Sequence, residues 1–223
     1  MLSRVRIAAA GAAVIFGCAA VGAASGCAPP QYTYLANRDN KTYFKVPASW
    51  HEIDQRVLKP DTSGASPSPG TDKSWIVAYD AADASTPSHL GASDTPDPIV
   101  YVSVQPSPEE ISGKVSLDDL RDLVLPVTAG ARSTAGTAGM TTFTGFNLVS
   151  DSELTTKLGL HGVHEIFEYR LRGGPLQTFD QTVYTNSDGS KVYLMLLRCS
   201  SECYQARHAE LESVTASFTV QES

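Results

Sequence analysis

The C-terminal third of the chain has the clearest pattern of apolar and polar positions. Short β-branched and aromatic runs predict three strands over residues 163–171, 178–185 and 191–198, and Gly189 suits the turn before the last one. Both faces of the last strand are apolar, one carrying Val192, Leu194 and Leu196 and the other Tyr193, Met195 and Leu197. A strand of this kind lies centrally in a sheet that is covered on both sides, so we expect helices above and below it.

The N-terminal half predicts four further strands. Residues 32–35 and 42–46 form a hairpin around an Asn- and Asp-rich turn, and Pro47 ends it just before Trp50. Residues 75–79 and 99–104 are β-branched and aromatic runs that favour strands. The Ser-, Pro- and Asp-rich segments between these runs, 61–70 and 80–98, predict loops.

Helical patterns occur twice. Ser116 and Asp119 match a capping box, Leu117, Leu120 and Val124 follow at helical spacing, and Pro126 ends the pattern. Tyr204, His208 and Leu211 form the stripe of a second helix after Cys203, before a short closing strand at 216–220. The Ala-, Gly-, Ser- and Thr-rich segment 129–139 lacks the Gly-Lys-Ser/Thr of a phosphate loop, and we expect a flexible connection.

The first residues are typical of an export signal. Arg4 and Arg6 precede an uncharged apolar run over residues 7–24. Small residues then lead into a cysteine in Ala24-Ser25-Gly26-Cys27. This motif resembles the lipobox of bacterial lipoproteins, in which the thiol is acylated and the chain is cut before it. The resemblance implies that Cys27 becomes the lipidated first residue.

The lipobox divides the chain into a signal peptide over 1–26, a lipidated tether over 27–31 and a single domain over 32–223. Cys18 is a rival lipidation site that would shorten the apolar run severely. An uncleaved span is the other alternative, since about 18 apolar residues can cross a bilayer. Each alternative places the rest of the chain outside the cytoplasm, anchored to the cell membrane.

The net charge of the chain limits the class of partner that it can bind. The chain has 17 basic and 24 acidic residues, a net charge of −7 that becomes −9 once the two signal arginines are removed. This balance argues against nucleic acid as a partner.

Cys199 and Cys203 lie four residues apart at a strand-to-helix junction, and an exported protein favours a disulfide between them. A redox pair, or half of a metal site with His208, is the alternative.

The order of elements carries a family resemblance. A hairpin ends in Val46-Pro47-x-x-Trp50, strands and helices follow, and the chain closes with Ser217-Phe218-Thr219-Val220. This order resembles the PsbP and Mog1 fold, including lipid-anchored actinobacterial relatives of the mycobacterial Lpq type. The resemblance implies an α+β fold, an α/β/α sandwich in which helices cover both faces of an antiparallel sheet. It also implies non-enzymatic accessory or binding roles in the cell envelope.

No residue constellation compels a reaction. His161, His164 and Glu165 resemble a metalloprotease string, but the two histidines are three residues apart, so on a strand they point to opposite faces and cannot share an ion. There is no Gly-x-Ser-x-Gly motif. We predict no catalytic residue, metal or cofactor, and an accessory or binding protein that presents its loops to an envelope protein or lipid. The alternatives are a hydrolase of cell-wall polymer or lipid with two cleft carboxylates, and a carrier of a hydrophobic ligand.

Overall fold

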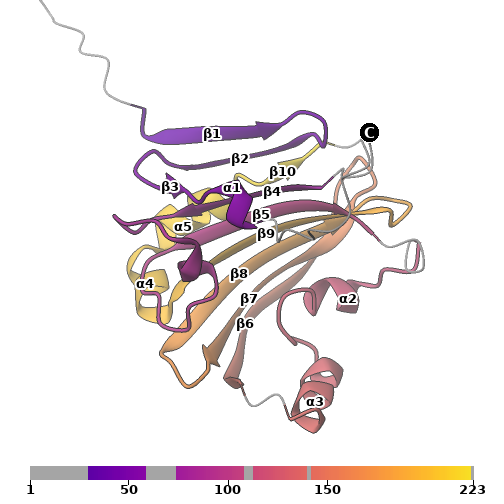
Figure 1. Ribbon diagram of the computed structural model, residues 1–223. Helices are drawn as coiled ribbons and strands as arrows, with labels where there is room; N and C mark the ends of the chain where they lie inside the picture. Colours follow the sequence, from indigo (N-terminus) through magenta and orange to yellow (C-terminus); the bar gives the residue numbers. More distant parts are fainter. Residues whose placement is uncertain (1–29, 59–73, 108–112, 140–141, 222–223) are drawn as a thin grey trace, which may run out of the picture.

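Two antiparallel sheets organise the computed structural model, which describes residues 30–58, 74–107, 113–139 and 142–221 (Figure 1). The larger sheet has the order β3-β4-β5-β9-β8-β7-β6, and the smaller one the order β1-β2-β10. The strands are β1 Tyr32–Asn37, β2 Thr42–Pro47, β3 His51–Glu52, β4 Trp75–Asp80, β5 Ile99–Pro106, β6 Phe143–Thr155, β7 His161–Leu171, β8 Leu176–Thr185, β9 Lys191–Ser200 and β10 Thr219–Val220.

The helices are short. They are α1 Gln55–Leu58, the 3₁₀ turn η1 Pro87–Leu90, α2 Leu117–Arg121, α3 Ala129–Thr137, α4 Ser201–Ala206 and α5 His208–Thr215. In the part of the chain that the structure describes, none of them has the length and apolar character needed to span a membrane.

Strand β9 occupies the centre of the larger sheet, as its two apolar faces predict. On one side, which we call the α5 face, Tyr193, Met195 and Leu197 pack with residues of α4 and α5 such as Leu211. Phe44 and Phe218 bring the smaller sheet into this same core. The alternation of a strand thus produces one continuous apolar cluster on this face.

The opposite side, which we call the α2 face, has a thinner cover. Leu120 of α2 packs on Val163, Val183 and Leu194. The capping box forms as predicted, with the Asp119 amide donating to Ser116 Oγ at 3.1 Å and the Ser116 amide donating to the Asp119 carboxylate at 2.8 Å. The α2 helix has five residues, and the segment around η1 supplies another part of the cover. The fold is therefore mixed α+β with antiparallel sheets, while a helical layer on both faces is not established.

Two segments differ from the sequence predictions. Residues Ala129–Thr137 form α3 rather than a flexible connection. The Thr128 side chain accepts a hydrogen bond from the Ala131 amide, and Arg132 lies 4.0 Å from the ring centroid of Phe146. A helix cap and one cation–π contact therefore order a segment whose composition is typical of a flexible linker.

The long strand β6, Phe143–Thr155, was not predicted. Its pairing with β7 is interrupted between Thr144 and Asn147 and again between Leu148 and Ser150, and Gly145 has a φ of 69°. These irregularities break the alternation on which strand prediction depends. The helix predicted after Cys203 is divided into α4 and α5, and the closing strand shortens to β10.

The segments predicted to direct export and lipidation are not among the residues that the structure describes. Cys18, Cys27 and the apolar run 7–24 are outside the described residues, as is the loop predicted over 61–70.

Candidate functional site

A cavity of about 280 Å³ opens on the α2 face, at the end of the larger sheet beside η1. Its floor consists of side chains from three neighbouring strands: Ile99 and Tyr101 of β5, Leu196 and Arg198 of β9, and Phe179 of β8. These residues share a face because β5, β9 and β8 pair in register, with Ile99 and Phe179 both opposite Arg198. The strand pattern therefore builds an apolar floor that contains one cation.

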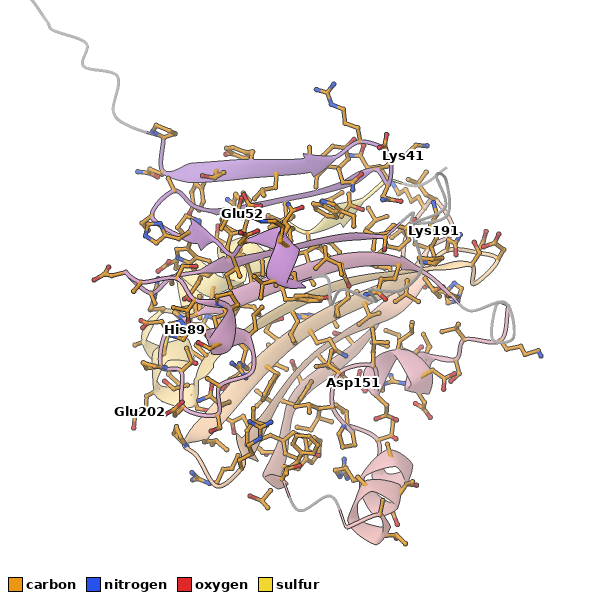
Figure 2. All side chains as sticks on the ribbon, viewed as in Figure 1. Lys41, Glu52, His89, Asp151, Lys191 and Glu202 are labelled. Atoms are coloured by element: carbon orange, nitrogen blue, oxygen red, sulfur yellow. The ribbon has the colours of Figure 1, made fainter. Side chains whose placement is uncertain are left out.

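The segment after η1 forms the first wall, with Leu90, Gly91 and Ser93. His89 of η1, which is labelled in Figure 2, attaches this wall to the sheet at two points. Its Nδ1 lies 2.6 Å from Asp80 Oδ2, and its carbonyl oxygen accepts a hydrogen bond from Arg198 Nη2 at 2.6 Å. Asp80 is fully buried and also accepts from the Ala82 amide at 2.9 Å. The wall is thus fixed by polar contacts rather than by helical packing.

Val124 and Leu125, which follow α2, form the second wall. One Asp122 carboxylate oxygen accepts from the amides of Val127 and Thr128 at 2.7 and 2.8 Å. The Tyr169 hydroxyl donates to the Pro126 carbonyl at 2.6 Å. These bonds hold an irregular segment against the sheet, so the second wall is also ordered.

The rim is the meeting point of β6 and β7. Thr142, Phe143, Leu171 and Arg172 line it. Arg172 is exposed and has a φ of 50°, a left-handed conformation, and its amide donates to the Thr142 carbonyl at 2.7 Å. The rim therefore carries a second cation near the opening.

The charged side chains that line the cavity are all positive. Two arginines line it and no carboxylate does. Arg198 is 7% exposed, and burial lowers the pKa of its guanidinium. The guanidinium lies 6.0 Å from the ring centroid of Phe179. The site can therefore surround an apolar group and offer hydrogen-bond donors to an anion.

The cysteines predicted to form a disulfide meet on the α5 face. Cys199 is buried at the end of β9, Cys203 lies in α4, and the two side chains hydrogen-bond each other as thiols. That hydrogen bond raises the pKa of Cys199 and lowers the pKa of Cys203, which Arg207 lowers further. Both cysteines are free thiols in this structure, and the disulfide between them stays a prediction.

The His161, His164 and Glu165 string divides between the two faces of the sheet. On the α5 face, His164 Nε2 lies 2.9 Å from Asp180 Oδ1, and the Asp180 hydrogen bond raises the pKa of His164. On the α2 face, Glu165 is fully buried and accepts a bond from Gln181 Nε2 at 2.8 Å. Burial raises the pKa of Glu165 to about 8. Within the described segments, no three His, Cys, Asp or Glu side chains gather as metal ligands would.

A second hollow, of about 500 Å³, lies on the α5 face between β6, β7, β8 and α4. Glu168 is the one carboxylate among its lining residues, and Asn147 Nδ2 donates to that carboxylate at 2.9 Å. Neither this hollow nor the cavity on the α2 face is lined by the pair of facing carboxylates that a glycosidase needs.

Sequence reasoning missed both cavity arginines. A signal for Arg198 was present, because it continues the row of Leu194 and Leu196 on an inward-facing position of a central strand. A cation at an inward position is costly unless it has a role or a partner. Arg172 follows β7 in a turn and had no such signal.

Comparisons with known proteins found no family model and no curated protein that matches the chain. Several solved structures are similar to it, and three of them show the range of the resemblance. Cyanobacterial PsbP (CyanoP) from Synechocystis sp. PCC 6803 has a TM-score of 0.47 and 20% identity, over 90% of this chain and 99% of that one. The protein PA94 from Pseudomonas aeruginosa, titled a putative regulator of unknown function, has a TM-score of 0.43 and 11% identity, over 87% and 100%.

The third is the Saccharomyces cerevisiae Ran-binding protein Mog1p, with a TM-score of 0.44 and 6% identity, over 85% of this chain and 95% of Mog1p. Proteins with the PsbP and Mog1 fold are thus among the solved structures that this chain resembles. All three TM-scores are below 0.5, so we base no functional inference on them.

Proposed function

We propose that this protein is a lipid-anchored, extracytoplasmic binding protein of the bacterial cell envelope, and that the cavity on the α2 face takes the apolar part of its ligand. The observation that carries the proposal is an apolar cavity with ordered walls and no carboxylate in its lining. The proposal selects the hydrophobic-ligand alternative among the binding roles expected from the sequence.

The size of the cavity limits the ligand. Its volume of about 280 Å³ is at the small end of the range for ligand sites, so it suits one short chain or one ring system rather than a whole diacyl lipid. Removing an alkyl group from water contributes about 0.8 kcal/mol for each buried CH₂. Walls fixed by Asp80, Asp122 and Tyr169 reduce the ordering that binding would otherwise require.

The hydrolase alternative has less support. It requires two carboxyl groups across a cleft, one to protonate the leaving group and one to activate water or attack the sugar. The carboxylate nearest to such a role, Glu168, already accepts a bond from Asn147 and has no acidic partner in the lining of its hollow. The apolar cavity therefore favours binding over hydrolysis.

Calorimetric titration with octanol tests the binding site. The chain from Ala28 onward, exported behind a cleavable signal that lacks a lipobox, carries neither the apolar run nor a lipid and avoids the need for detergent. We expect it to take one octanol. In that background, Val124→Trp fills the cavity and weakens octanol binding at least tenfold. Leu123→Trp is the matched control, because Leu123 is 44% exposed beside Val124 and does not line the cavity. Equal binding by the Val124→Trp chain, or no saturable binding at all, would reject the proposal.

The lipid anchor rests on the lipobox at Cys27, the feature shared with the Lpq-type lipoproteins that the sequence resembles. Stable attachment requires more than one acyl chain, as a processed lipoprotein carries. In cells fed labelled palmitate, Cys27→Ser should abolish labelling and leave the signal peptide uncleaved, and globomycin should block signal cleavage in the parent chain. Cys18→Ser is the matched control and should change neither. Labelling that persists in Cys27→Ser and disappears in Cys18→Ser would move the anchor to Cys18.

A further inference from the structure

The guanidinium of Arg198 lacks the partner that a buried charge requires. Its side chain is at the cavity floor, and its one described hydrogen bond is the 2.6 Å bond to the neutral carbonyl of His89. Among the described residues, no carboxylate lies within ion-pair distance of it. A guanidinium has five N–H donors, and a buried cation is stable when an anion or several acceptors satisfy them. The cavity therefore has donors that its own walls do not use.

A second cation strengthens the preference of the cavity for an anion. Arg172 lies at the rim of the same cavity, and in the described part of the chain its side chain has no ion-pair partner. The chain as a whole has a net charge of −7, so an opening lined by two arginines and no acid has the opposite sign to the chain's net charge. Such a local reversal attracts anions and repels cations at close range.

The remaining lining residues require the rest of the ligand to be apolar. Tyr101, Phe179 and Leu196 surround Arg198 on the floor, and Phe143 and Leu171 extend the apolar surface to the rim. A small inorganic anion would leave these side chains without a contact. A neutral hydrocarbon would give the guanidinium no acceptor beyond the His89 carbonyl.

We propose that the ligand of this cavity is a single-chain amphiphile with a small anionic head group, a carboxylate or a phosphate. Its head group accepts hydrogen bonds from Arg198 and Arg172, and its chain lies against the apolar lining. Both head groups match the planar fork of a guanidinium, which can donate two parallel hydrogen bonds to them. This inference rests on the proposed function, since it names the ligand class of the same cavity.

Calorimetric titration with four probes of equal chain length tests it. Octanoate, octyl phosphate, octanol and octyltrimethylammonium are titrated at pH 7.5 into the same exported chain, which begins at Ala28 and carries no apolar run and no lipid. We expect at least one of the two anions to bind about tenfold more tightly than octanol, or about 1.4 kcal/mol. The ammonium probe should bind most weakly. A preference for octanoate identifies a carboxylate head group, and a preference for octyl phosphate identifies a phosphate.

Three arginine variants locate the effect. Arg198→Gln should reduce binding of the preferred anion to the level of octanol and leave octanol binding within about twofold. Arg172→Gln should weaken the anion about threefold, and because Arg172 is exposed this variant keeps the test valid if Arg198→Gln fails to fold. Arg38→Gln removes the same charge from the exposed β1–β2 turn and should change nothing.

The failures can be told apart. If octanol binds as tightly as both anions, the head-group proposal is wrong and the apolar cavity remains a binding site. If none of the four probes binds, the proposed function itself is wrong. Tightest binding by octyltrimethylammonium, or an equal loss of anion binding in Arg38→Gln, also overturns the assignment to the cavity arginines.

Discussion

The two faces of the larger sheet are covered by different kinds of element. On the α5 face, two helices and the smaller sheet produce one continuous core in which Tyr193, Met195 and Leu197 have almost no exposure. On the α2 face, a five-residue helix and two irregular segments leave a cavity between them. Regular elements present repeating rows of side chains that interdigitate, whereas irregular segments do not. The cavity beside η1 therefore lies where loops replace helices, whereas the hollow of the α5 face lies outside that continuous core, beside β6.

The buried polar side chains of β7 and β8 follow the same division. Asp180, buried on the α5 face, has His164 at 2.9 Å and the Tyr204 hydroxyl at 2.8 Å. On the α2 face, Glu165 Oε2 and Gln181 Oε1 are buried without a hydrogen-bond partner. Native interiors contain few such groups, because each one costs free energy. The buried polar groups of the α2 face therefore contribute less to the free energy of unfolding, and some of their oxygens have no hydrogen-bond donor.

The largest expected effect comes from two adjacent leucines of β9. Leu197→Ala empties a fully buried position on the α5 face and should lower the free energy of unfolding by about 2 to 5 kcal/mol. Leu196→Ala enlarges a cavity that already exists and should cost only about 1 kcal/mol. Urea denaturation of both variants measures the difference. Equal losses would show that the two faces are packed alike.

The next effect is a pH dependence specific to the α2 face. Burial raises the pKa of Glu165 from 4.5 to about 8, so the folded chain retains this proton to a higher pH than the unfolded chain does. Stability is therefore lost as the pH rises from about 4.5 through about 8. Glu165→Gln stays neutral and should be more stable than the parent at pH 9, by on the order of a few kcal/mol, and similar to it at pH 4.5.

Denaturation midpoints across this pH range provide the measurement for Glu165→Gln. The matched control is Glu153→Gln, which neutralises an exposed carboxylate of β6 and should leave the shape of the profile unchanged. Parallel profiles for the parent and Glu165→Gln would mean that Glu165 ionises normally in the folded chain.

The smallest effect concerns the neighbouring residue on the opposite face. The hydrogen bond to Asp180 raises the pKa of His164 above 6.5, so its stabilisation is complete below that pH and is lost as the pH rises through the raised value. His164→Gln should lower the free energy of unfolding by about 1 kcal/mol at pH 5.5, because partial exposure screens the pair, and by less at pH 9. His208→Gln, at an exposed position, serves as the control. A loss that is equal at both pH values would exclude the ion pair as its cause.

The strands were predictable to the degree that their side chains alternate. The hairpin of β1 and β2, the central position of β9 and the capping box of α2 all depend on local patterns that tertiary contacts reinforce. Strand β6 and helix α3 escaped prediction because bulges hide the period of β6, and a cap with one Arg132–Phe146 contact orders α3. The cavity was beyond sequence reasoning, because it exists only where η1, the segment after α2 and the β6–β7 edge come together.

The position of Arg198 has a consequence for how the cavity can change. Arg198 and Cys199 are consecutive residues of β9 that point to opposite faces, opposite Phe179 and Thr178 of β8. A slip of β9 by one residue would move Arg198 from the cavity to the apolar core on the other face. The turn over residues 186–190, which joins β8 to β9 at the opposite end of both strands, fixes this register. The length of that turn therefore determines the charge of the cavity. A single-residue insertion there would place Leu197 opposite Phe179 and remove the cation from the cavity, although the insertion itself lies far from the lining.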